Sequence, residues 1–231
     1  MTGGLIFDMD GVLFDSHPIH RKVWRELLQC MGRVVSDEEL DFIMDGARRE
    51  EILFHFLGHL TPEQARICSE QKDARFEKEE SHLRTVPGLE SFLDLAEAAG
   101  IPKAVATCAS RPRTKRMLQQ HGLVSRFTAI VTGDDVTQGK SDPAIFLRSA
   151  EELGVAPRDV LVIEDAVPAI KAAKGVGMKC VGIATGPRVS QLLRAGADLV
   201  VSDFSQLCLS DVERVFSPQG LAHCVPCKNA L

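Results

Sequence analysis

Two acidic pairs follow apolar stretches that lie far apart in the sequence. Asp8 and Asp10 come after the stretch LIF, and Glu164 and Asp165 come after VLVI. Neighbouring carboxylates repel each other unless a cation lies between them. Mg²⁺ binds one or two carboxylates together with waters and phosphate oxygens, so it suits these ligands. The two pairs predict a magnesium site, although Asp8 and Asp10 alone could be ordinary turn or capping residues.

A hydroxyl group and a lysine could complete a phosphate pocket. Thr107 ends the apolar stretch KAVAT, and Lys140 lies in TQGKSDPAIF, shortly before a helix expected to begin near Asp142. Lysine, hydroxyl and helix N-terminal amide groups bind phosphate oxygens when they meet at one point. Taken singly, Lys140 could be an exposed lysine and Thr107 a hydroxyl bonded to the backbone. Together with the acidic pairs, they indicate chemistry on a small phosphorylated metabolite.

Short apolar stretches alternate with helix-like stretches over most of the chain. Four of the helix-like stretches end at a glycine, the usual stop signal: Gly100, Gly122, Gly154 and Gly177. This alternation predicts an α/β fold with a Rossmann-like parallel sheet and helices on both faces. Ligands of such sheets bind at the carboxyl ends of the strands, where the acidic pairs also lie. The expected strands cover 5–9, 103–107, 128–132, 160–164, 179–183 and 197–201.

Residues 17–83 break this alternation, because they contain consecutive helix-like stretches and no expected strand. We therefore expect an all-helical cap domain at 17–83, inserted after the first strand. The α/β core domain then consists of residues 1–16 and 84–231. Two helix starts in the insertion carry capping-box residues, Ser36 with Glu39 and Thr61 with Gln64.

The composition is that of an ordinary globular protein with a sizeable core, with 231 residues, 45% hydrophobic and 26% charged. A formal net charge of −5 argues against a general nucleic-acid binder, and an aromatic content of 5% indicates no base-stacking surface. We expect no membrane partner, since no apolar stretch approaches the roughly 20 residues that span a bilayer. The N-terminus also lacks the features of a secretory signal.

Seven cysteines, an odd number at scattered positions, do not resemble a disulfide framework. A reducing compartment, and so a cytoplasmic location, is expected. Cys224 and Cys227 lie two residues apart beside His223. This tail could bind a metal, but no second ligand pair is evident, so a loosely ordered tail is favoured. The sequence leaves the oligomeric state open.

The four strand-end motifs occur as FDMDGV, VATCAS, GKSDP and VIEDA, in this order. Together they resemble the motifs of the haloacid-dehalogenase (HAD) superfamily of phosphotransferases. The resemblance implies that Asp8 attacks phosphorus to form an aspartyl-phosphate and that Asp10 is the general acid and base. It also implies that Thr107 and Lys140 bind the oxygens of the transferring phosphoryl group, with Lys140 pairing with Asp8.

The same resemblance implies Mg²⁺ as the cofactor. The ion would be held by Asp8, by the backbone carbonyl of Asp10 and by Asp165, with Glu164 binding directly or through water. The presence of Asp10 and of the metal-binding pair argues against the dehalogenases that name the superfamily. Phosphoryl transfer is therefore the expected reaction.

The helical insertion is similar to that of the branch containing β-phosphoglucomutase and related sugar-phosphate phosphatases. This likeness makes Arg49 a group that grips the non-reacting end of the substrate and Lys72 a contact to Asp10 and substrate. His20 lies one helical turn before Trp24, so both could instead be packing residues. The loop TCASRP departs from the mutase pattern. The candidate substrate-binding residues are Ser16, His20, Arg49, Lys72, Ser110 and Arg111.

Three functions remain open at this point. A phosphatase of a small sugar phosphate is favoured, and a β-phosphoglucomutase is a close alternative, because both reactions use the same aspartyl-phosphate. A non-catalytic module that binds a phosphorylated metabolite is the alternative of another class. The presence of Asp8, Asp10, Lys140 and Asp165 argues against this third alternative.

Overall fold

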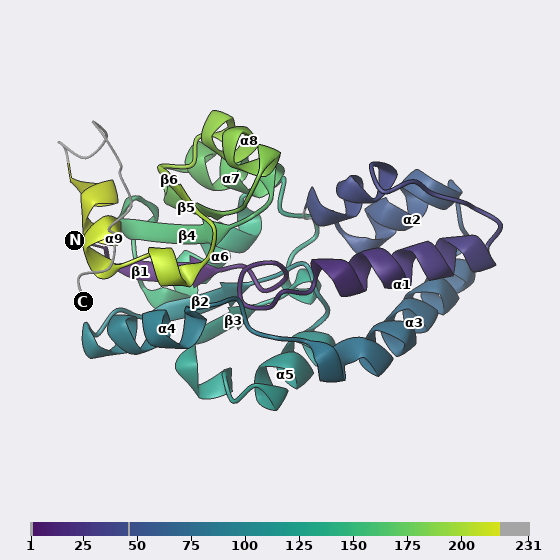
Figure 1. The fold of residues 1–231 in the computed structure, drawn as a ribbon, viewed down its shortest axis with the longest axis horizontal. Helices are drawn as coiled ribbons and strands as arrows, with labels where there is room; N and C mark the ends of the chain where they lie inside the picture. The colour runs from purple at the N-terminus through teal and green to yellow at the C-terminus, as the bar shows by residue number, and fades with distance from the viewer. Residues whose placement is uncertain (1, 46, 218–231) are drawn as a thin grey trace.

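A computed structural model describes residues 2–45 and 47–217 of the chain (Figure 1). At its centre is a sheet of six parallel strands in the order β3-β2-β1-β4-β5-β6. All six expected strands are present, so the predicted parallel α/β fold is confirmed. The possible metal-binding tail, with His223, Cys224 and Cys227, lies outside the described residues. The strands are β1 (Gly4–Phe7), β2 (Lys103–Ala106), β3 (Ala129–Val131), β4 (Val160–Glu164), β5 (Lys179–Ile183) and β6 (Leu199–Val201).

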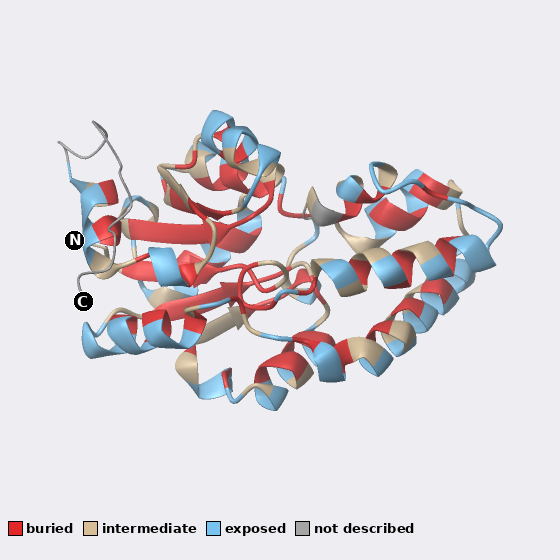
Figure 2. Cartoon of the chain, viewed as in Figure 1, coloured by how far each residue is buried: buried red, intermediate tan, exposed pale blue. Residues whose placement is uncertain are grey.

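Helices cover both faces of the sheet. Successive residues of a strand point to opposite faces, so each strand contributes side chains to both layers of the core. Leu5 and Phe7 of β1 belong to one buried cluster, and Ile6 between them belongs to the other. Figure 2 shows the central strands β1, β2 and β4 buried between these layers. The first cluster includes residues of α4 (Leu89–Ala98), α5 (Arg111–Gln120) and α9 (Leu209–Phe216). The second includes residues of α6 (Ala144–Leu153), α7 (Val167–Gly175) and α8 (Pro187–Ala195).

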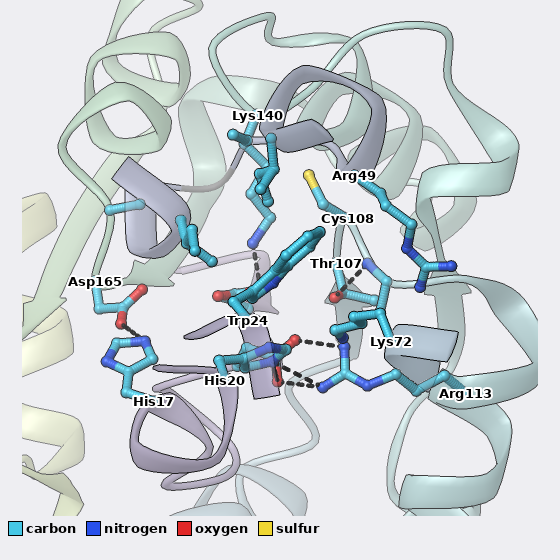
Figure 3. A pocket seen from close by; sticks show the side chains of 17 residues that line it. His17, His20, Trp24, Arg49, Lys72, Thr107, Cys108, Arg113, Lys140 and Asp165 are labelled. Carbon is cyan, nitrogen blue, oxygen red and sulfur yellow. Dashed lines mark hydrogen bonds and ion pairs between the residues drawn. The ribbon is translucent and has the colours of Figure 1, made fainter. Parts of the chain in front are cut away.

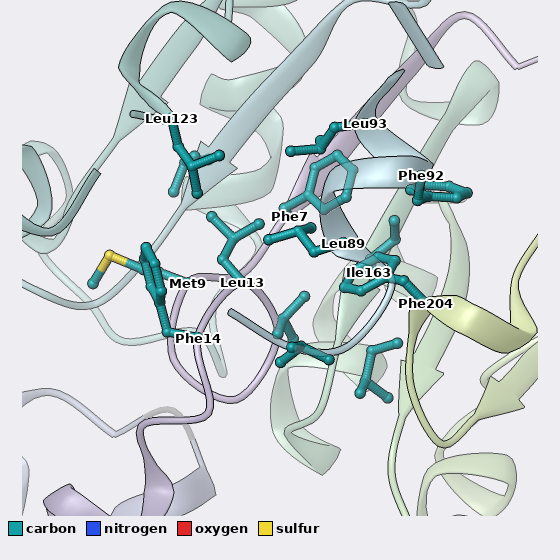
Figure 4. Packing of buried hydrophobic residues seen from close by; sticks show 14 of the residues in the cluster. Phe7, Met9, Leu13, Phe14, Leu89, Phe92, Leu93, Leu123, Ile163 and Phe204 are labelled. Carbon is teal, nitrogen blue, oxygen red and sulfur yellow. The ribbon is translucent and has the colours of Figure 1, made fainter. Parts of the chain in front are cut away.

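The end of the central strand is fixed by aromatic packing (Figure 4). The ring of Phe7 lies 6.2 Å from that of Phe92, 5.8 Å from Phe127 and 6.1 Å from Phe204, measured between centroids. Such contacts stabilise a core beyond the area they bury. Because Phe7 directly precedes Asp8, this cluster holds the backbone from which the Asp8 side chain extends.

The helical insertion lies at one end of the molecule, away from the sheet (Figure 1). Its helices share a hydrophobic cluster of their own, which includes Trp24, Leu27 and Phe56. The two linkers to the core run side by side, since Asp15 N donates to Arg84 O at 2.9 Å. The insertion contains α1 (His17–Cys30), the 3₁₀ helix η1 (Glu39–Asp45), α2 (Arg49–Leu57), α3 (Pro62–Glu79) and the 3₁₀ helix η2 (Glu80–His82).

Both expected capping boxes form, but they start different kinds of helix. Thr61 Oγ1 accepts from Gln64 N at 3.2 Å and begins the 18-residue α3. Glu39 Oε2 accepts from Ser36 N at 2.8 Å, yet η1 after it is a 3₁₀ helix of seven residues. Short segments favour 3₁₀ bonds, because few residues can make the longer α-helical bond. In the described part of the chain, no helix combines the length and apolar character needed to cross a membrane.

Candidate active site

The strand order brings the expected core residues to one edge of the sheet. Phe7 of β1 pairs with Val105 of β2 and with Ile163 of β4. Asp8 comes one residue later, level with the end of both neighbouring strands. The carboxyl ends of parallel strands therefore place Asp8 beside the groups at the ends of β2 and β4. These groups are Thr107, Glu164 at the last position of β4, and Asp165. Asp8, Thr107 and Asp165 line a cavity of about 90 Å³ (Figure 3), and Glu164 lies close to Asp8 and Asp165.

Lys140 lies buried between two carboxylates. Its Nζ contacts Asp8 Oδ1 and donates to Glu164 Oε1 at 2.6 Å, and only 2% of the Lys140 surface is exposed. Burial opposes the charged form of the lysine, but the carboxylates of Asp8 and then Glu164 hold the pKa of Lys140 above its ordinary value. Burial also raises the pKa of Asp8, against the lowering effect of Lys140. The sequence prediction that Lys140 pairs with Asp8 agrees with this geometry.

Glu164 orients the turn between β4 and α7. Its Oε2 accepts from the backbone N–H groups of Asp165 and Ala166, both at 2.8 Å. Both oxygens of Glu164 are thus engaged, one by Lys140 and one by these two amides. The Asp165 carboxylate lies near that of Asp8. Its Oδ2 is 2.9 Å from His17 Nε2. Burial opposes protonation of His17, but Asp165 raises the pKa of His17 to about 9.

The acidic cluster has the donor chemistry of a divalent-cation site. Asp8, Glu164 and Asp165 each present a carboxylate oxygen, and these oxygens lie within 4.8 Å of one another. All three residues are buried. Buried hard oxygen donors with space for waters and phosphate fit Mg²⁺. Three of the four predicted metal-binding residues, Asp8, Glu164 and Asp165, therefore lie together, whereas the Asp10 side chain is outside this cluster. Lys140 and His17 are the cations that contact the cluster.

Asp10 turns toward the insertion and is held there by three residues. Its Oδ1 accepts from Ser16 Oγ at 2.7 Å and lies 3.1 Å from His20 Nε2. Arg113 donates to both oxygens, at 2.6 Å to Oδ1 and 2.9 Å to Oδ2. Burial acts to raise the pKa of Asp10, but Arg113 and then His20 hold it well below its usual value. In this arrangement Asp10 is a carboxylate.

Arg113 is a site residue that the sequence reasoning missed. It lies in α5 with only 4% of its surface exposed, and its guanidinium carbon is 4.2 Å from the centroid of the Phe76 ring. Helical spacing could have identified it, because residues four apart share one face. Met117, four residues later, is fully buried, whereas Arg111, two residues earlier, points the other way.

The other cationic candidates from the insertion line the cavity. Arg49 donates to both oxygens of Asp73, at 2.9 and 2.7 Å. Lys72 is 3% exposed, and its Nζ lies 4.7 Å from the Phe76 ring centroid. Burial, and then the charges of Arg113 and Arg49, lower the pKa of Lys72 well below its ordinary value.

Three predicted substrate contacts lie away from the cavity wall. Ser16 is buried, with its hydroxyl on Asp10. Arg111 is exposed and pairs with Asp135 at 2.6 Å, outside the residues that line the cavity. Ser110 stands at the N-cap of α5 and also does not line it. The structure therefore brings His20, Arg49 and Lys72 to the cavity, but places Ser110 and Arg111 beside it.

Comparison with known proteins identifies the family of this site. A family model described as "Haloacid dehalogenase-like hydrolase" matches residues 5–183, which include all four motifs and the helical insertion. The chain belongs to the haloacid dehalogenase-like hydrolase family. The expected superfamily is thus confirmed.

The relatives of the chain include a phosphatase and a phosphomutase. A "Phosphorylated carbohydrates phosphatase" of Thermotoga maritima is 29% identical over 187 residues, 76% of this chain and 82% of the relative. "Beta-phosphoglucomutase" of Bacillus subtilis is 28% identical over 231 residues, 96% of this chain and 99% of the relative. The crystal structure of β-phosphoglucomutase from Clostridium difficile has the same fold, with a TM-score of 0.84 at 24% identity, covering 94% and 97% of the two chains. These family relatives support an enzyme of phosphoryl transfer, a phosphatase or a related phosphomutase.

Proposed function

We propose that the chain is a Mg²⁺-dependent phosphatase of a small sugar phosphate or similar metabolite, which works through an aspartyl-phosphate. The buried contact of Lys140 with Asp8 and Glu164 carries this proposal most strongly. The ammonium of Lys140 opposes the rise that burial causes in the pKa of Asp8, so it favours the carboxylate form, and it orients Asp8 at a strand end, as a nucleophile requires. The curated relatives named above include a phosphatase of phosphorylated carbohydrates, which supports the substrate class.

The chemistry divides into two displacements at phosphorus. First, an Asp8 carboxylate oxygen attacks phosphorus, the bond to the leaving oxygen breaks, and Asp10 gives that oxygen a proton. Then water attacks the phosphorus of the aspartyl-phosphate, Asp10 takes the proton from the water, and the bond to Asp8 breaks to release phosphate. Thr107 and Lys140 bind the phosphoryl oxygens in both steps.

Mg²⁺ would be held by Asp8, Asp165 and the backbone carbonyl of Asp10, with Glu164 reached through water. When bound, it neutralises charge on the phosphoryl oxygens and on the nucleophile. The two oxygens of Glu164 already engage Lys140 and the start of α7, so this residue orients the site.

Residues 17–83 would act as the cap of this active site. Their helices contribute His20, Arg49 and Lys72 to a cavity whose other walls come from the core. A cap that closes over bound substrate excludes water and selects the leaving group. The hinge of the cap would then be formed by the two linkers, 14–16, which includes Ser16, and 84–86.

The decisive experiment measures phosphate release from sugar phosphates by wild type and Asp8→Asn. We expect Mg²⁺-dependent release by wild type, abolished by chelation. Asp8→Asn should lose at least about 1,000-fold in kcat, since removal of a nucleophile removes the covalent route. Phosphate release that survives in Asp8→Asn would contradict the aspartyl-phosphate. Absence of release from any phosphate ester would favour the non-catalytic module instead.

A phosphomutase is the second candidate, because the Bacillus subtilis β-phosphoglucomutase aligns with 96% of this chain. Both activities share the first displacement and differ in whether water or a sugar hydroxyl accepts the phosphoryl group. ³¹P NMR with Mg²⁺, β-glucose 1-phosphate and a trace of glucose 1,6-bisphosphate separates them. Glucose 6-phosphate without free phosphate would show a mutase, and free phosphate would show a phosphatase.

A further inference from the structure

The general acid and base of the proposed reaction is bound by an arginine of the core. Both oxygens of Asp10 accept from Arg113, and Oδ1 also accepts from Ser16 and lies beside His20. To protonate a leaving oxygen, Asp10 must carry a proton on one oxygen and turn that oxygen toward the substrate. A bidentate arginine pair prevents this turn, because it occupies both oxygens of Asp10. Arg113 must therefore release Asp10 before the reaction.

Around Arg113, three basic side chains of the cavity wall share two carboxylates. Arg113 pairs with Asp10 and Arg49 pairs with Asp73, whereas Lys72 has, among the described residues, a single ion pair, 3.9 Å from Asp73. The side chain of Lys72 is nevertheless 4% exposed. Burial, and then the charges of Arg113 and Arg49, lower the pKa of Lys72, and an anion bound beside Lys72 would favour its protonated form.

Arg113 itself keeps an unused donor. Its Nε is buried and has no hydrogen-bond partner among the described residues. Arg113 and Lys72 both contact the Phe76 ring, so the two cations lie on one aromatic side chain (Figure 3 shows the cations side by side). An anion placed here would satisfy both cations, and no carboxylate of the described chain does so at present.

We infer that Arg113 is a positioning residue that exchanges Asp10 for a second anionic group of the substrate. The substrate is then a phosphate monoester that carries a further phosphate or carboxylate, which Arg113 and Lys72 bind. This inference rests on the proposed function and specifies its substrate class. Asp10 stays bound to Arg113 when a phosphate ester has a neutral far end, and such an ester reacts slowly. Selectivity arises because only the second anion completes the active arrangement.

Matched substrates test this exchange. Glucose 6-phosphate, 6-phosphogluconate and glucose 1,6-bisphosphate share a six-carbon skeleton and differ in a neutral, carboxylate or phosphate far end. Ethyl phosphate and phosphoglycolate form a shorter pair. For wild type, kcat/KM should be roughly 10- to 100-fold higher for the better anionic member of a series than for its neutral member, which is the effect of a hydrogen bond to a charged group. Comparison of the carboxylate and phosphate members shows which anion the cavity accepts.

Arg113→Met should have opposite effects on the two kinds of substrate. It should reduce kcat/KM for the anionic member until that member and the neutral one react at similar rates. It should also raise kcat for the neutral member several-fold, since Asp10 is no longer bound. A merely structural role would lower both. Arg113→Lys keeps a cation without the bidentate geometry, so it should retain part of the preference and serves if Arg113→Met folds poorly.

Arg116→Met is the matched control. Arg116 lies on the same helix, donates to both oxygens of the buried Glu80 at 2.9 and 2.8 Å, and does not line the cavity. The Arg116→Met variant likewise removes a bidentate arginine–carboxylate pair of α5, and it should keep the wild-type preference for the anionic substrate.

Several results would overturn the inference while leaving the proposed function intact. These are Asp8-dependent turnover with no preference for a second anion, a preference that persists in Arg113→Met, or equal losses on both substrate classes. Failure of every substrate to give Asp8-dependent turnover would instead refute the proposed function, and the inference with it.

Discussion

At the scale of single residues, His20 shows how burial sets a charge state in the cavity. Its Nε2 lies 3.1 Å from Asp10 Oδ1 and 3.1 Å from Arg113 Nη2. A proton on Nε2 would bond well to Asp10 but would face the guanidinium. Burial lowers the pKa of His20 to about 3, against the raising effect of Asp10, and the charges of Lys72 and Arg113 lower it further. His20 is therefore neutral in the folded protein.

This pKa predicts a pH-dependent stability. Unfolded His20 takes up a proton below about pH 6.5, whereas the folded residue does not until about pH 3. Because the unfolded state binds more protons in this window, folding loses up to about 1.4 kcal/mol per pH unit as pH falls through it. Relative to wild type, His20→Gln should therefore gain free energy of unfolding between pH 6.5 and pH 4.5, measured by urea titration. An unchanged difference across these pH values would contradict the prediction, and the exposed His59→Gln is the control.

The sequence predicted the core residues of the site better than those of the insertion. Asp8, Thr107 and Asp165 follow buried strands, and a parallel sheet brings such ends together whatever the rest of the chain does. Arg113 reaches Asp10 across 103 residues, and only the phase of α5 directs it inward. The loop TCASRP after β2 contains Arg111 but ends one residue before Arg113, and local sequence does not state which arginine faces the cavity.

At the scale of elements, Gly88 joins the returning linker to α4. Its φ of +79° lies in the left-handed region, and a Cβ there would lie 2.3 Å from Ser205 N. Because that contact is with backbone, relief requires the η6 turn (Phe204–Gln206) to move. The turn is tied to the linker, since Phe204 N donates to Pro87 O at 3.0 Å.

Gly88→Ala should lower the free energy of unfolding by about 2–4 kcal/mol, the sum of left-handed strain and overpacking. Gly100→Ala is the matched control, because its φ is +66° and no atom lies within 4 Å of the added Cβ. It should cost only about 1–2 kcal/mol. Urea titration of both variants measures the difference, and equal losses would mean that the contact with η6 yields without cost.

The elements themselves were predictable where the signal is local. Apolar stretches located all six strands, and Gly100, Gly122, Gly154 and Gly177 follow helices with positive φ. The segment near 39–45 was less predictable, because its capping box marks a helix start without fixing the type. Its packing against α1 and α7 is long-range information.

At the scale of the whole molecule, polar bridges close the insertion onto the core beside the cavity. Arg188 Nη2 of α8 donates to Asp45 Oδ1 at 2.5 Å. Arg48 Nη1 donates to Thr137 O, also at 2.5 Å. These groups are partly exposed, so each bridge contributes about 0–1 kcal/mol. Together they can bias a closed arrangement without preventing substrate entry.

The double variant Asp45→Asn with Arg48→Met should therefore shift the free protein toward an open arrangement. Loss of about 1–2 kcal/mol changes the ratio of closed to open molecules by roughly 5- to 30-fold. We expect a larger radius of gyration by small-angle X-ray scattering without substrate. KM should rise severalfold with little change in kcat, because substrate binding must then supply the closing energy. Arg66→Met is the control, since Arg66 pairs only with Glu63 and Glu70 of its own helix among the described residues. If the double variant matches this control in both measurements, these bridges do not hold the insertion closed, and closure depends on the contacts inside the cavity.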